Sequence, residues 1–335
     1  MTGATRLIVR APNWLGDAVM ALPALAAVRR AHRGTTIVLA ARPSIAPLFE
    51  QDTPAAPDEI LVIDASRETA QLREASAEAI LLLPNSFESA WRASRAGIAE
   101  RCGYRAGGRG WLLTRAVPRP GGRLHQIDYY RALVRGLGID APHDEAPRLA
   151  PRPRARQAAD ALLGAHGVRP GEALVGFAPG AAYGHAKQWP PARVAQVIAA
   201  LAARGVRAVL VGAAADRDTA RAIESSLAAG SRAVNLVGRT SLGQLVGVID
   251  RCLAFVSNDS GAMHVAAALG VPLTAMFGPT DERVTAPGGR PEIIDVLVRD
   301  VFCRPCLLRE CPIDHRCMKR IDVDTVLRSI AGHLE

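Results

Sequence analysis

The sequence predicts an α/β protein made of two doubly wound parallel sheets, and three observations lead to this prediction. The chain has 335 residues, which is long for one domain and enough for two domains with separate cores. Apolar residues make up 49% of the chain but aromatic residues only 4%, which favours Ala, Leu, Val and Ile packed between helices and a parallel sheet. Short apolar runs alternate with amphipathic ones, as in repeated strand-helix units.

The first half of the chain, from Arg6 to about Gly138, contains several such units. Strands are expected at 7–10, 36–40, 60–63 and 79–83, and helices near 17–30, 67–76, 87–95 and 125–136. The stretch 101–123 differs, because it carries six arginines among many glycines, with Tyr104 and Trp111 between them. This stretch is either a solvated loop or a phosphate-binding surface for a large anionic substrate.

A linker is predicted between Ile139 and Ala155, where four prolines accompany mixed charges without an apolar period. This linker divides the chain into domains at 1–150 and 151–335. The second domain repeats the alternation, with strands expected at 174–177, 208–211, 234–237, 253–256 and 273–277, and helices at 191–204, 216–228, 242–250, 261–269 and 323–334. Two such domains on a short linker are expected to leave a ligand-binding cleft between their strand ends.

The charge of the chain indicates polyanionic partners. The formal net charge is +9, which favours a nucleotide, a phosphorylated substrate, an anionic membrane face or nucleic acid as partner. No apolar run reaches the roughly eighteen residues of a membrane span, and the amino terminus is a short strand instead of a signal peptide, so a cytoplasmic location is expected. Only two of the 41 basic residues are lysines, Lys187 and Lys319. Because the chain otherwise uses arginine, a lysine marks either a position that needs a compact, mobile positive charge or a chance occurrence.

The stretch Arg10–Pro23 places a carboxylate at the bend between a strand and a helix. Asp17 follows an apolar strand and a Pro-Asn-Trp-Leu-Gly turn, and a helical pattern opens directly behind it. Ligands of open parallel sheets bind at the carboxyl ends of the strands, so Asp17 is expected near the ligand. The structural alternative is that Asp17 is a helix N-cap.

The loop 179–190 follows the first strand of the second domain and has the features of a phosphate site. Gly180 and Gly184 let the backbone approach a ligand, the following helix offers free N–H groups, and Lys187 adds a mobile positive charge. The loop is neither a Walker loop nor Gly-x-Gly-x-x-Gly, which argues against a kinase or a dehydrogenase.

A second site is predicted where the strand at 253–256 ends and a helix of small residues begins. Hydroxyl, carboxylate and helix amides converge there, which suits a sugar diphosphate, with amides and Ser260 on phosphate and Asp259 on hydroxyls. The alternative for Asp259 is an N-cap, and His264 either reaches the ligand or is a satisfied buried histidine. Thr280 ends the next strand on the same side. The predicted donor residues are Asn258, Asp259, Ser260, Gly261, His264 and Thr280.

Two long motifs, 13–17 with its continuation 20–23, and 258–264 followed by 277–280, resemble those of the heptosyltransferases of lipopolysaccharide core synthesis, glycosyltransferase family 9. The Pro-Asn-Trp-Leu-Gly-Asp form is typical of the heptosyltransferase II branch. The resemblance also takes in Leu83-Pro84-Asn85-Ser86, Cys102-Gly103-Tyr104-Arg105 and the cysteine-rich tail, so it covers almost the whole chain.

This resemblance implies a GT-B fold, with two Rossmann-like domains facing across a cleft, the acceptor in the first and the sugar nucleotide in the second. It implies transfer of L-glycero-D-manno-heptose from ADP-heptose to the first heptose of the lipid-linked inner core. Asp17 then matches the family's proposed catalytic base, and Lys187 the lysine on the donor diphosphate. Asp259, Ser260, Gly261 and His264 match its donor-binding turn, and Asp216 is the candidate for the acidic residue that holds the ribose.

The residues fit an inverting transfer, which needs a carboxylate to take the acceptor proton and positive charge on the leaving diphosphate. No Asp-x-Asp pair accompanies the phosphate loop, so no catalytic metal is expected. The arginines of 101–123 are expected to grip the phosphates of the inner core and to draw the protein to the anionic inner face of the membrane.

The tail holds four cysteines within fifteen residues, with His315 among them. Because disulfides are not expected in a reducing compartment, this cluster is either a structural zinc site or a group of reduced thiols in a packed turn. The cysteines are Cys303, Cys306, Cys311 and Cys317.

Two alternatives to heptose transfer follow from the same residues. The first is a GT-B enzyme with another sugar nucleotide, either a different glycosyltransferase or a sugar-nucleotide epimerase. The second is a non-catalytic basic module that binds a nucleotide or another polyanion. The sequence disfavours this second alternative, and nucleic acid as its ligand, because it contains no nucleic-acid-binding motif.

Overall fold

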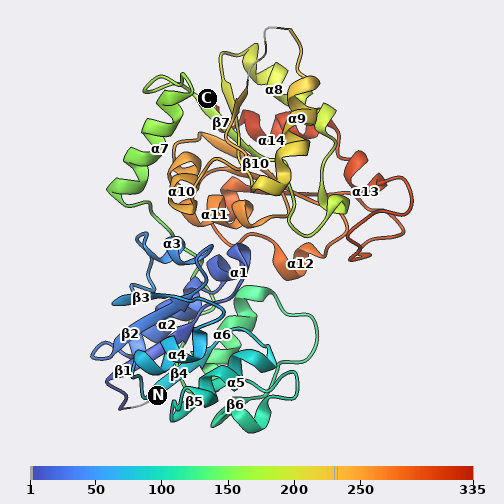
Figure 1. Ribbon diagram of the computed structural model, residues 1–335. Coiled ribbons are helices and arrows are strands. Elements are labelled where there is room, and N and C mark those ends of the chain that lie inside the picture. Colours follow the sequence, from blue (N-terminus) through green and yellow to red (C-terminus); the bar gives the residue numbers. More distant parts are fainter. Residues whose placement is uncertain (1–2, 230, 232, 335) are drawn as a thin grey trace. The chain divides into compact units, whose positions relative to one another are not determined.

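The computed structural model describes residues 3–229, 231 and 233–334, and the chain divides into two compact units, Met1–Leu149 and Ala150–Glu335 (Figure 1). The described part of each unit contains a six-stranded parallel sheet flanked by helices. The strand orders are β3-β2-β1-β4-β5-β6 and β12-β11-β10-β7-β8-β9. Each order reverses at its central pair, β1/β4 and β10/β7, which is the point where open α/β sheets bind ligands.

The strands of unit 1 include two that the sequence did not predict. They are β1 Arg6–Arg10, β2 Thr36–Ala41, β3 Glu59–Val62, β4 Ala79–Leu82, β5 Glu100–Tyr104 and β6 Arg115–Val117. β6 and all but the first residue of β5 lie in the arginine-rich stretch 101–123, so the solvated-loop alternative does not hold for these residues. The charged residues fit here because Arg101 donates to the carbonyl oxygens of Ile98 and Leu112 at 2.5 and 2.7 Å.

The helices of unit 1 are α1 Leu15–Met20, α2 Leu22–Ala31, α3 Ala46–Phe49, α4 Glu68–Glu74, α5 Phe87–Arg95, the 3₁₀ turn η1 Gly110–Leu112, and α6 Gln126–Gly136. The single helix predicted at 17–30 is therefore two helices, and the first begins at Leu15. The break falls at Ala21 because Pro23, at the start of α2, has no N–H to continue the hydrogen-bond ladder of α1.

The first helix of unit 2 is α7 Pro153–Ala165, and its first residues lie in the predicted linker 139–155. Proline is favoured in the first turn of a helix, so Pro153 starts α7 instead of extending the linker. The strands are β7 Leu174–Ala178, β8 Arg207–Leu210, β9 Ala233–Asn235, β10 Ala254–Asn258, β11 Leu273–Phe277 and the unpredicted edge strand β12 Ile294–Val298. The remaining helices are α8 Pro191–Ala202, α9 Arg217–Ser225, α10 Leu242–Asp250, α11 Gly261–Leu269, α12 Glu282–Thr285, α13 Arg316–Lys319 and α14 Val323–Ala331, with 3₁₀ turns η2 His185–Lys187, η3 Ala214–Asp216 and η4 Pro291–Ile293.

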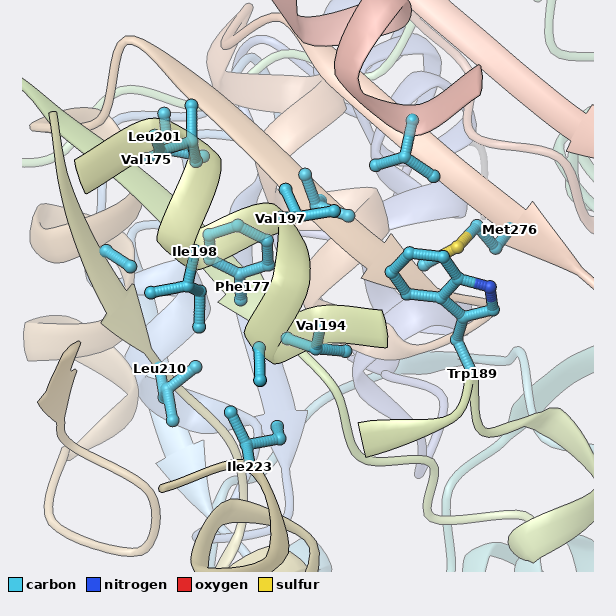
Figure 2. Close-up of a cluster of buried hydrophobic side chains, with 14 of the residues drawn as sticks. Val175, Phe177, Trp189, Val194, Val197, Ile198, Leu201, Leu210, Ile223 and Met276 are labelled. Atoms are coloured by element: carbon cyan, nitrogen blue, oxygen red, sulfur yellow. The ribbon is translucent and has the colours of Figure 1, made fainter. Parts of the chain in front are cut away.

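The core of unit 2 fixes the end of the loop that carries Lys187. Trp189 is fully buried among Val194, Val197 and Met276, in the layer between α8 and the sheet (Figure 2). Its indole Nε1 donates to the carbonyl oxygen of Ile321 at 3.0 Å. A large buried aromatic ring with a satisfied N–H is costly to move, so the loop leaves the core from a fixed point two residues after Lys187.

The helices of the described residues are all too short or too polar to cross a membrane.

Candidate active site

The predicted donor residues of unit 2 come together at the carboxyl ends of neighbouring strands. Asp259 follows β10, Thr280 follows β11, and Lys187 lies in the loop after β7. One carboxylate oxygen of Asp259, Oδ2, accepts from Lys187 Nζ at 2.6 Å and from Thr280 Oγ1 at 2.6 Å. The side chains of Asp259 and Lys187 are 7% and 11% exposed. Three sequence-distant predictions therefore meet in one compact, largely buried cluster.

Asn258 holds the loop 179–190, which the sequence predicts as a phosphate site and which is called the phosphate loop below. Its side chain is fully buried, donates Nδ2 to the carbonyl oxygen of Pro179 at 2.6 Å and accepts the backbone N–H of Trp189 at 3.1 Å. Both ends of the loop 179–189 are thus tied to the last residue of β10. These contacts use both ends of its side-chain amide, so Asn258 holds the loop in place.

The start of α11 supplies the backbone groups that the sequence predicted. Ser260 stands in the N-cap position with extended backbone, and its hydroxyl lies 3.0 Å from the hydroxyl of Ser257. Gly261 is the first residue of the helix, whose leading N–H groups are unpaired within the helix and favour an anion. His264 lies in the first turn of α11 and is 4% exposed, so it is part of the packed interior beside this helix end.

Asp216 lies between two loops of unit 2. Its carboxylate accepts the backbone N–H of Ala213 at 2.9 Å and that of Ala181 from the phosphate loop. Burial raises the pKa of Asp216, and these two N–H groups oppose the rise. A Cβ at Gly180 would lie 2.0 Å from the Asp216 carboxyl carbon, so the glycine is needed for this approach. Asp216 thus fastens the phosphate loop to the loop after β8.

The cysteine-rich tail packs against the same loops, which the sequence did not indicate. Arg304 donates Nε to the carbonyl oxygen of Gly278 at 2.7 Å and a terminal nitrogen to that of Thr280 at 2.8 Å. The same nitrogen reaches the Glu282 carboxylate at 2.6 Å. Arg304 therefore holds the turn that carries Thr280. No sequence signal separated it from the other 38 arginines.

The tail also contacts the loop that carries Lys187. His315 Nε2 lies 2.6 Å from the carbonyl oxygen of Ala186. The backbone N–H of Ala186 donates to the carbonyl oxygen of Arg309 at 2.9 Å. Tyr183 donates its hydroxyl to the carbonyl oxygen of Leu307 at 2.7 Å, and Lys187 Nζ lies 4.8 Å from the centre of its ring. Tyr183 is a neighbour of Lys187 that the sequence analysis did not select, although it lies inside the glycine-rich loop.

The four tail cysteines are all free thiols, and they differ in exposure: Cys317 is buried, Cys303 and Cys311 are half-buried and Cys306 is exposed. Burial raises the pKa of Cys317, and the three neighbouring thiols raise it further. Over the part of the chain that the structure describes, no three His, Cys, Asp or Glu side chains are arranged to hold a metal ion.

In unit 1, Asp17 lies at the third position of α1, and Trp14 occupies the N-cap position. The N-cap alternative for Asp17 is therefore wrong. Instead, its carboxylate is hydrogen-bonded by the hydroxyl of Tyr130, which is 3% exposed on α6 and also bonds Gln126. Burial raises the pKa of Asp17, and the Tyr130 hydrogen bond opposes the rise. A carboxylate with a raised pKa is a stronger base, as a proton acceptor requires.

The turn before Asp17 is held by a buried arginine. Arg10, at the end of β1, donates to the Glu68 carboxylate at 2.8 Å, to the carbonyl oxygen of Ala11 at 2.8 Å and to Asn13 Oδ1 at 3.2 Å. Glu68 also accepts from Arg92 at 2.5 Å. Paired charges of this kind inside a protein keep one geometry, so the Pro-Asn-Trp-Leu-Gly turn is fixed relative to β1.

A second buried arginine organises the neighbouring loop after β4. Arg109 has no exposed surface and donates to the carbonyl oxygens of Pro84 and Ser86 at 2.5 and 3.2 Å. Desolvation lowers the pKa of Arg109 to about 10, so the guanidinium stays charged at neutral pH. Asn85 donates to the hydroxyl of Tyr129 at 2.7 Å. Since β4 pairs with β1, this loop lies beside the Asp17 turn.

Comparisons with known proteins point to one family. A family model for glycosyltransferase family 9 (heptosyltransferase) matches residues 66–316. Lipopolysaccharide heptosyltransferase 2 of Salmonella typhimurium is 31% identical to the chain over 300 residues, which cover 84% of this chain and 85% of the relative. Lipopolysaccharide heptosyltransferase 2 of Escherichia coli K12 has the same identity and coverage.

Solved structures give the same result. The structure of E. coli ADP-heptose LPS heptosyltransferase II has a TM-score of 0.83 with 28% identity, and the match covers 98% of both chains. E. coli heptosyltransferase WaaC with ADP has a TM-score of 0.71 with 20% identity over 98% of this chain and 99% of that chain, which shows the fold alone. The two Rossmann-like units are those of the GT-B fold, and the chain belongs to glycosyltransferase family 9, the heptosyltransferases.

Proposed function

We propose that the chain transfers L-glycero-D-manno-heptose from ADP-heptose to the first heptose of the lipopolysaccharide inner core. The observation that carries the proposal is the Lys187–Asp259–Thr280 cluster at the switch point of unit 2 in a member of this family. The relatives named lipopolysaccharide heptosyltransferase 2 support the reaction, and the E. coli structures named for ADP and ADP-2-deoxy-2-fluoro heptose support the donor.

The donor half binds and activates the leaving group. Lys187 and the first N–H groups of α11 meet the diphosphate, and Ser260 adds a hydroxyl donor. Negative charge builds up on the diphosphate as its bond to the anomeric carbon breaks, so positive charge and oriented amides lower the barrier. Asp259, held by Thr280, has its carboxylate ready to accept from sugar hydroxyls.

The acceptor half supplies the base. Asp17 takes the proton of the acceptor hydroxyl while that oxygen bonds to the anomeric carbon from the face opposite the departing ADP, which inverts the configuration. The electron pair of the broken bond leaves with ADP. Tyr130 orients the Asp17 carboxylate throughout. The reaction as written uses only side chains and backbone groups of the chain.

The arginine-rich stretch contributes to acceptor binding through its outward members. Arg101 and Arg109 donate to carbonyl oxygens of the protein. Arg105, Arg115, Arg119 and Arg123 are exposed, and Arg115 also donates to the carbonyl oxygen of Leu137. Exposed guanidinium groups suit the phosphates of a lipid-linked inner core. A cytoplasmic location with peripheral contact to the anionic membrane face follows from such an acceptor.

The test is ADP release from ADP-heptose. Purified protein is expected to release ADP only when the inner-core acceptor is present, because the base acts on the acceptor hydroxyl. Asp17→Asn is expected to lose at least about 100-fold of this rate while binding ADP-heptose like the unchanged protein. Full activity in Asp17→Asn would remove Asp17 from the mechanism. Turnover of ADP-heptose without acceptor would favour the epimerase alternative, and other sugar nucleotides in the same assay test the donor.

The tail is proposed as a structural part of the donor half, with its four thiols reduced. A zinc ion bound there is the remaining alternative. Elemental analysis of the purified, reduced protein separates them, because a structural zinc would be found at one equivalent per chain.

A further inference from the structure

Unit 1 carries an exposed aromatic cluster that the transfer chemistry does not use. Phe87, Trp91 and Trp111 are 43%, 44% and 70% exposed. The ring centres lie 6.3 Å apart for Phe87 and Trp91 and 6.2 Å apart for Phe87 and Trp111. Large aromatic rings gathered on a surface generally mark a binding face, because isolated exposed rings are common but contiguous groups are not.

The cluster is built by two elements that lie side by side. On α5, Phe87, Trp91 and the exposed Arg95 follow one another at intervals of four residues, so they form one outward stripe, while Ala90 and Ala93 face the sheet. Trp111 comes from η1, whose next residue, Leu112, is buried. Figure 1 shows α5 beside β5 and β6, the strands that η1 connects.

The surroundings of the cluster are positively charged. Arg95 ends the stripe, and the side chain of the exposed Arg105 lies against Gly110, the residue before Trp111. The neighbouring acid Glu88 is hydrogen-bonded and neutralised by Arg92. Aromatic rings with flanking arginines are the composition of membrane-interface segments: the rings enter the headgroup region and each arginine near an anionic surface contributes about 1 kcal/mol.

The position of the cluster matches a lipid-linked acceptor. Phe87 directly follows the loop 84–86 at the carboxyl end of β4, and β4 pairs with β1, whose carboxyl end leads to Asp17. The aromatic cluster thus begins at the same edge of the sheet as the proposed base. If two copies of the chain associated through this face, Arg95 and Arg105 of one copy would face the same arginines of the other and repel them. An anionic bilayer instead attracts these positive charges.

We propose that Phe87, Trp91 and Trp111, flanked by Arg95 and Arg105, form the surface by which the protein binds an anionic phospholipid bilayer. The proposal rests on the proposed function, since it places the chain at the membrane that carries the acceptor. It assigns membrane contact to the aromatic stripe of α5 and to η1.

The test is partition of the full chain onto vesicles of phosphatidylcholine with or without phosphatidylglycerol, measured by co-sedimentation without substrate. The unchanged chain is expected to bind the phosphatidylglycerol vesicles, with a blue shift of tryptophan emission. Trp91→Ser with Trp111→Ser is expected to lower the partition coefficient about tenfold or more. Arg95→Gln with Arg105→Gln is expected to lower it about tenfold on the anionic vesicles only. Phe302→Ser, at a ring that is 79% exposed in unit 2, is the matched control and is expected to change nothing.

Unchanged partition of the tryptophan variant, or no binding by the unchanged chain, would overturn the proposal. A change of sedimentation coefficient in that variant with vesicle binding intact would assign the surface to a second copy, which also overturns it. Circular dichroism and ADP affinity verify that the variants are folded. Since partition is measured without turnover, it can fail while heptose transfer stands, and transfer can fail while partition stands. In the tryptophan variant, transfer to vesicle-embedded acceptor is expected to fall, while transfer to a deacylated acceptor stays intact.

Discussion

The Lys187–Asp259 pair shows how single residues prepare the donor site. Its two side chains are nearly buried, and Thr280 adds a second donor to the same carboxylate oxygen. Breaking a buried ion pair by removing one partner leaves an uncompensated charge and costs about 3–5 kcal/mol. Asp259 therefore holds the ammonium of Lys187 at one place beside the start of α11. A diphosphate can attract this lysine without first having to order a free side chain.

Tyr130 is the residue that sets the basicity of Asp17 together with burial. Its hydroxyl stabilises the ionised carboxylate, so it lowers a pKa that burial has raised. Tyr130→Phe removes this hydrogen bond, so the pKa of Asp17 is expected to rise further. Activity needs the ionised form, so the acid limb of the kcat/KM profile for transfer is expected to move to higher pH.

The matched control is Tyr104→Phe. Tyr104 is equally buried, but its hydroxyl donates to the backbone of Tyr129 at 2.6 Å and not to Asp17. The Tyr104 variant is expected to keep the position of the acid limb even where its overall rate changes. An acid limb that stays in place in Tyr130→Phe would show that the hydrogen bond has no influence on the base.

At the scale of elements, the tail is the part whose role only the three-dimensional structure reveals. Arg304 joins the tail to three acceptors around the turn 278–282, and its side chain is 8% exposed. Arg304→Ala leaves these acceptors without a donor and frees Thr280, which holds Asp259. The dissociation constant of ADP-heptose is expected to rise about tenfold, measured by calorimetry.

Arg316→Ala is the control for this prediction, because Arg316 lies in the same tail but bonds Asp314, two residues away. The affinity of the Arg316→Ala variant for ADP-heptose is expected to match that of the unchanged chain. Arg304→Lys keeps a positive charge beside Glu282 but lacks the planar guanidinium. It is therefore expected to restore part of the lost affinity for ADP-heptose. Equal donor affinity in Arg304→Ala and Arg316→Ala would show that the tail does not position the donor site.

The sequence predicted those elements that have both an apolar period and clear ends. The helices at 87–95, 242–250 and 261–269 have the predicted bounds, with Ser86 and Ser241 as side-chain caps and Gly270 in the left-handed conformation after the last one. The strands β5 and β6 were missed because arginines occupy positions that a solvated loop would also have. Arg101 and Arg115 donate to the carbonyl oxygens of Leu112 and Leu137, and these pairings across 11 and 22 residues leave no local pattern in the sequence.

The same difference applies to the site. Asp17, Lys187 and Asp259 were predicted because each stands at a strand end, where topology alone brings ligand-binding residues together. Tyr130 and Arg304 act across more than twenty residues of sequence, on a helix face and in a tail that carry no motif of their own. Sequence therefore identified residues at the strand ends, including Asn258 and Thr280, which hold their neighbours in position, but it did not identify Tyr130 and Arg304.

At the scale of the whole molecule, the proposed reaction is divided between two units with separate sheets. Met1–Leu149 contains 19 basic and 15 acidic residues, and Ala150–Glu335 contains 22 and 17, so each unit has a net positive charge of similar size. Both halves are thus suited to phosphorylated ligands. The donor residues Lys187, Asp216, Asp259 and Thr280 all belong to unit 2, and Asp17 with Tyr130 belongs to unit 1.

This division predicts which amides a ligand protects from hydrogen exchange. ADP is expected to slow exchange in the loop 179–190 and at 259–264 of unit 2, because binding stabilises the closed form of the segments that hold it. At a concentration of about 100 times its dissociation constant, the gain of about 2.7 kcal/mol corresponds to roughly 100-fold slower exchange for amides that open only after ADP leaves. An inner-core fragment without ADP is expected to protect 84–86 and the Asp17 turn instead. Protection of the unit 2 loops by the acceptor fragment alone would contradict the assignment of donor and acceptor to different units.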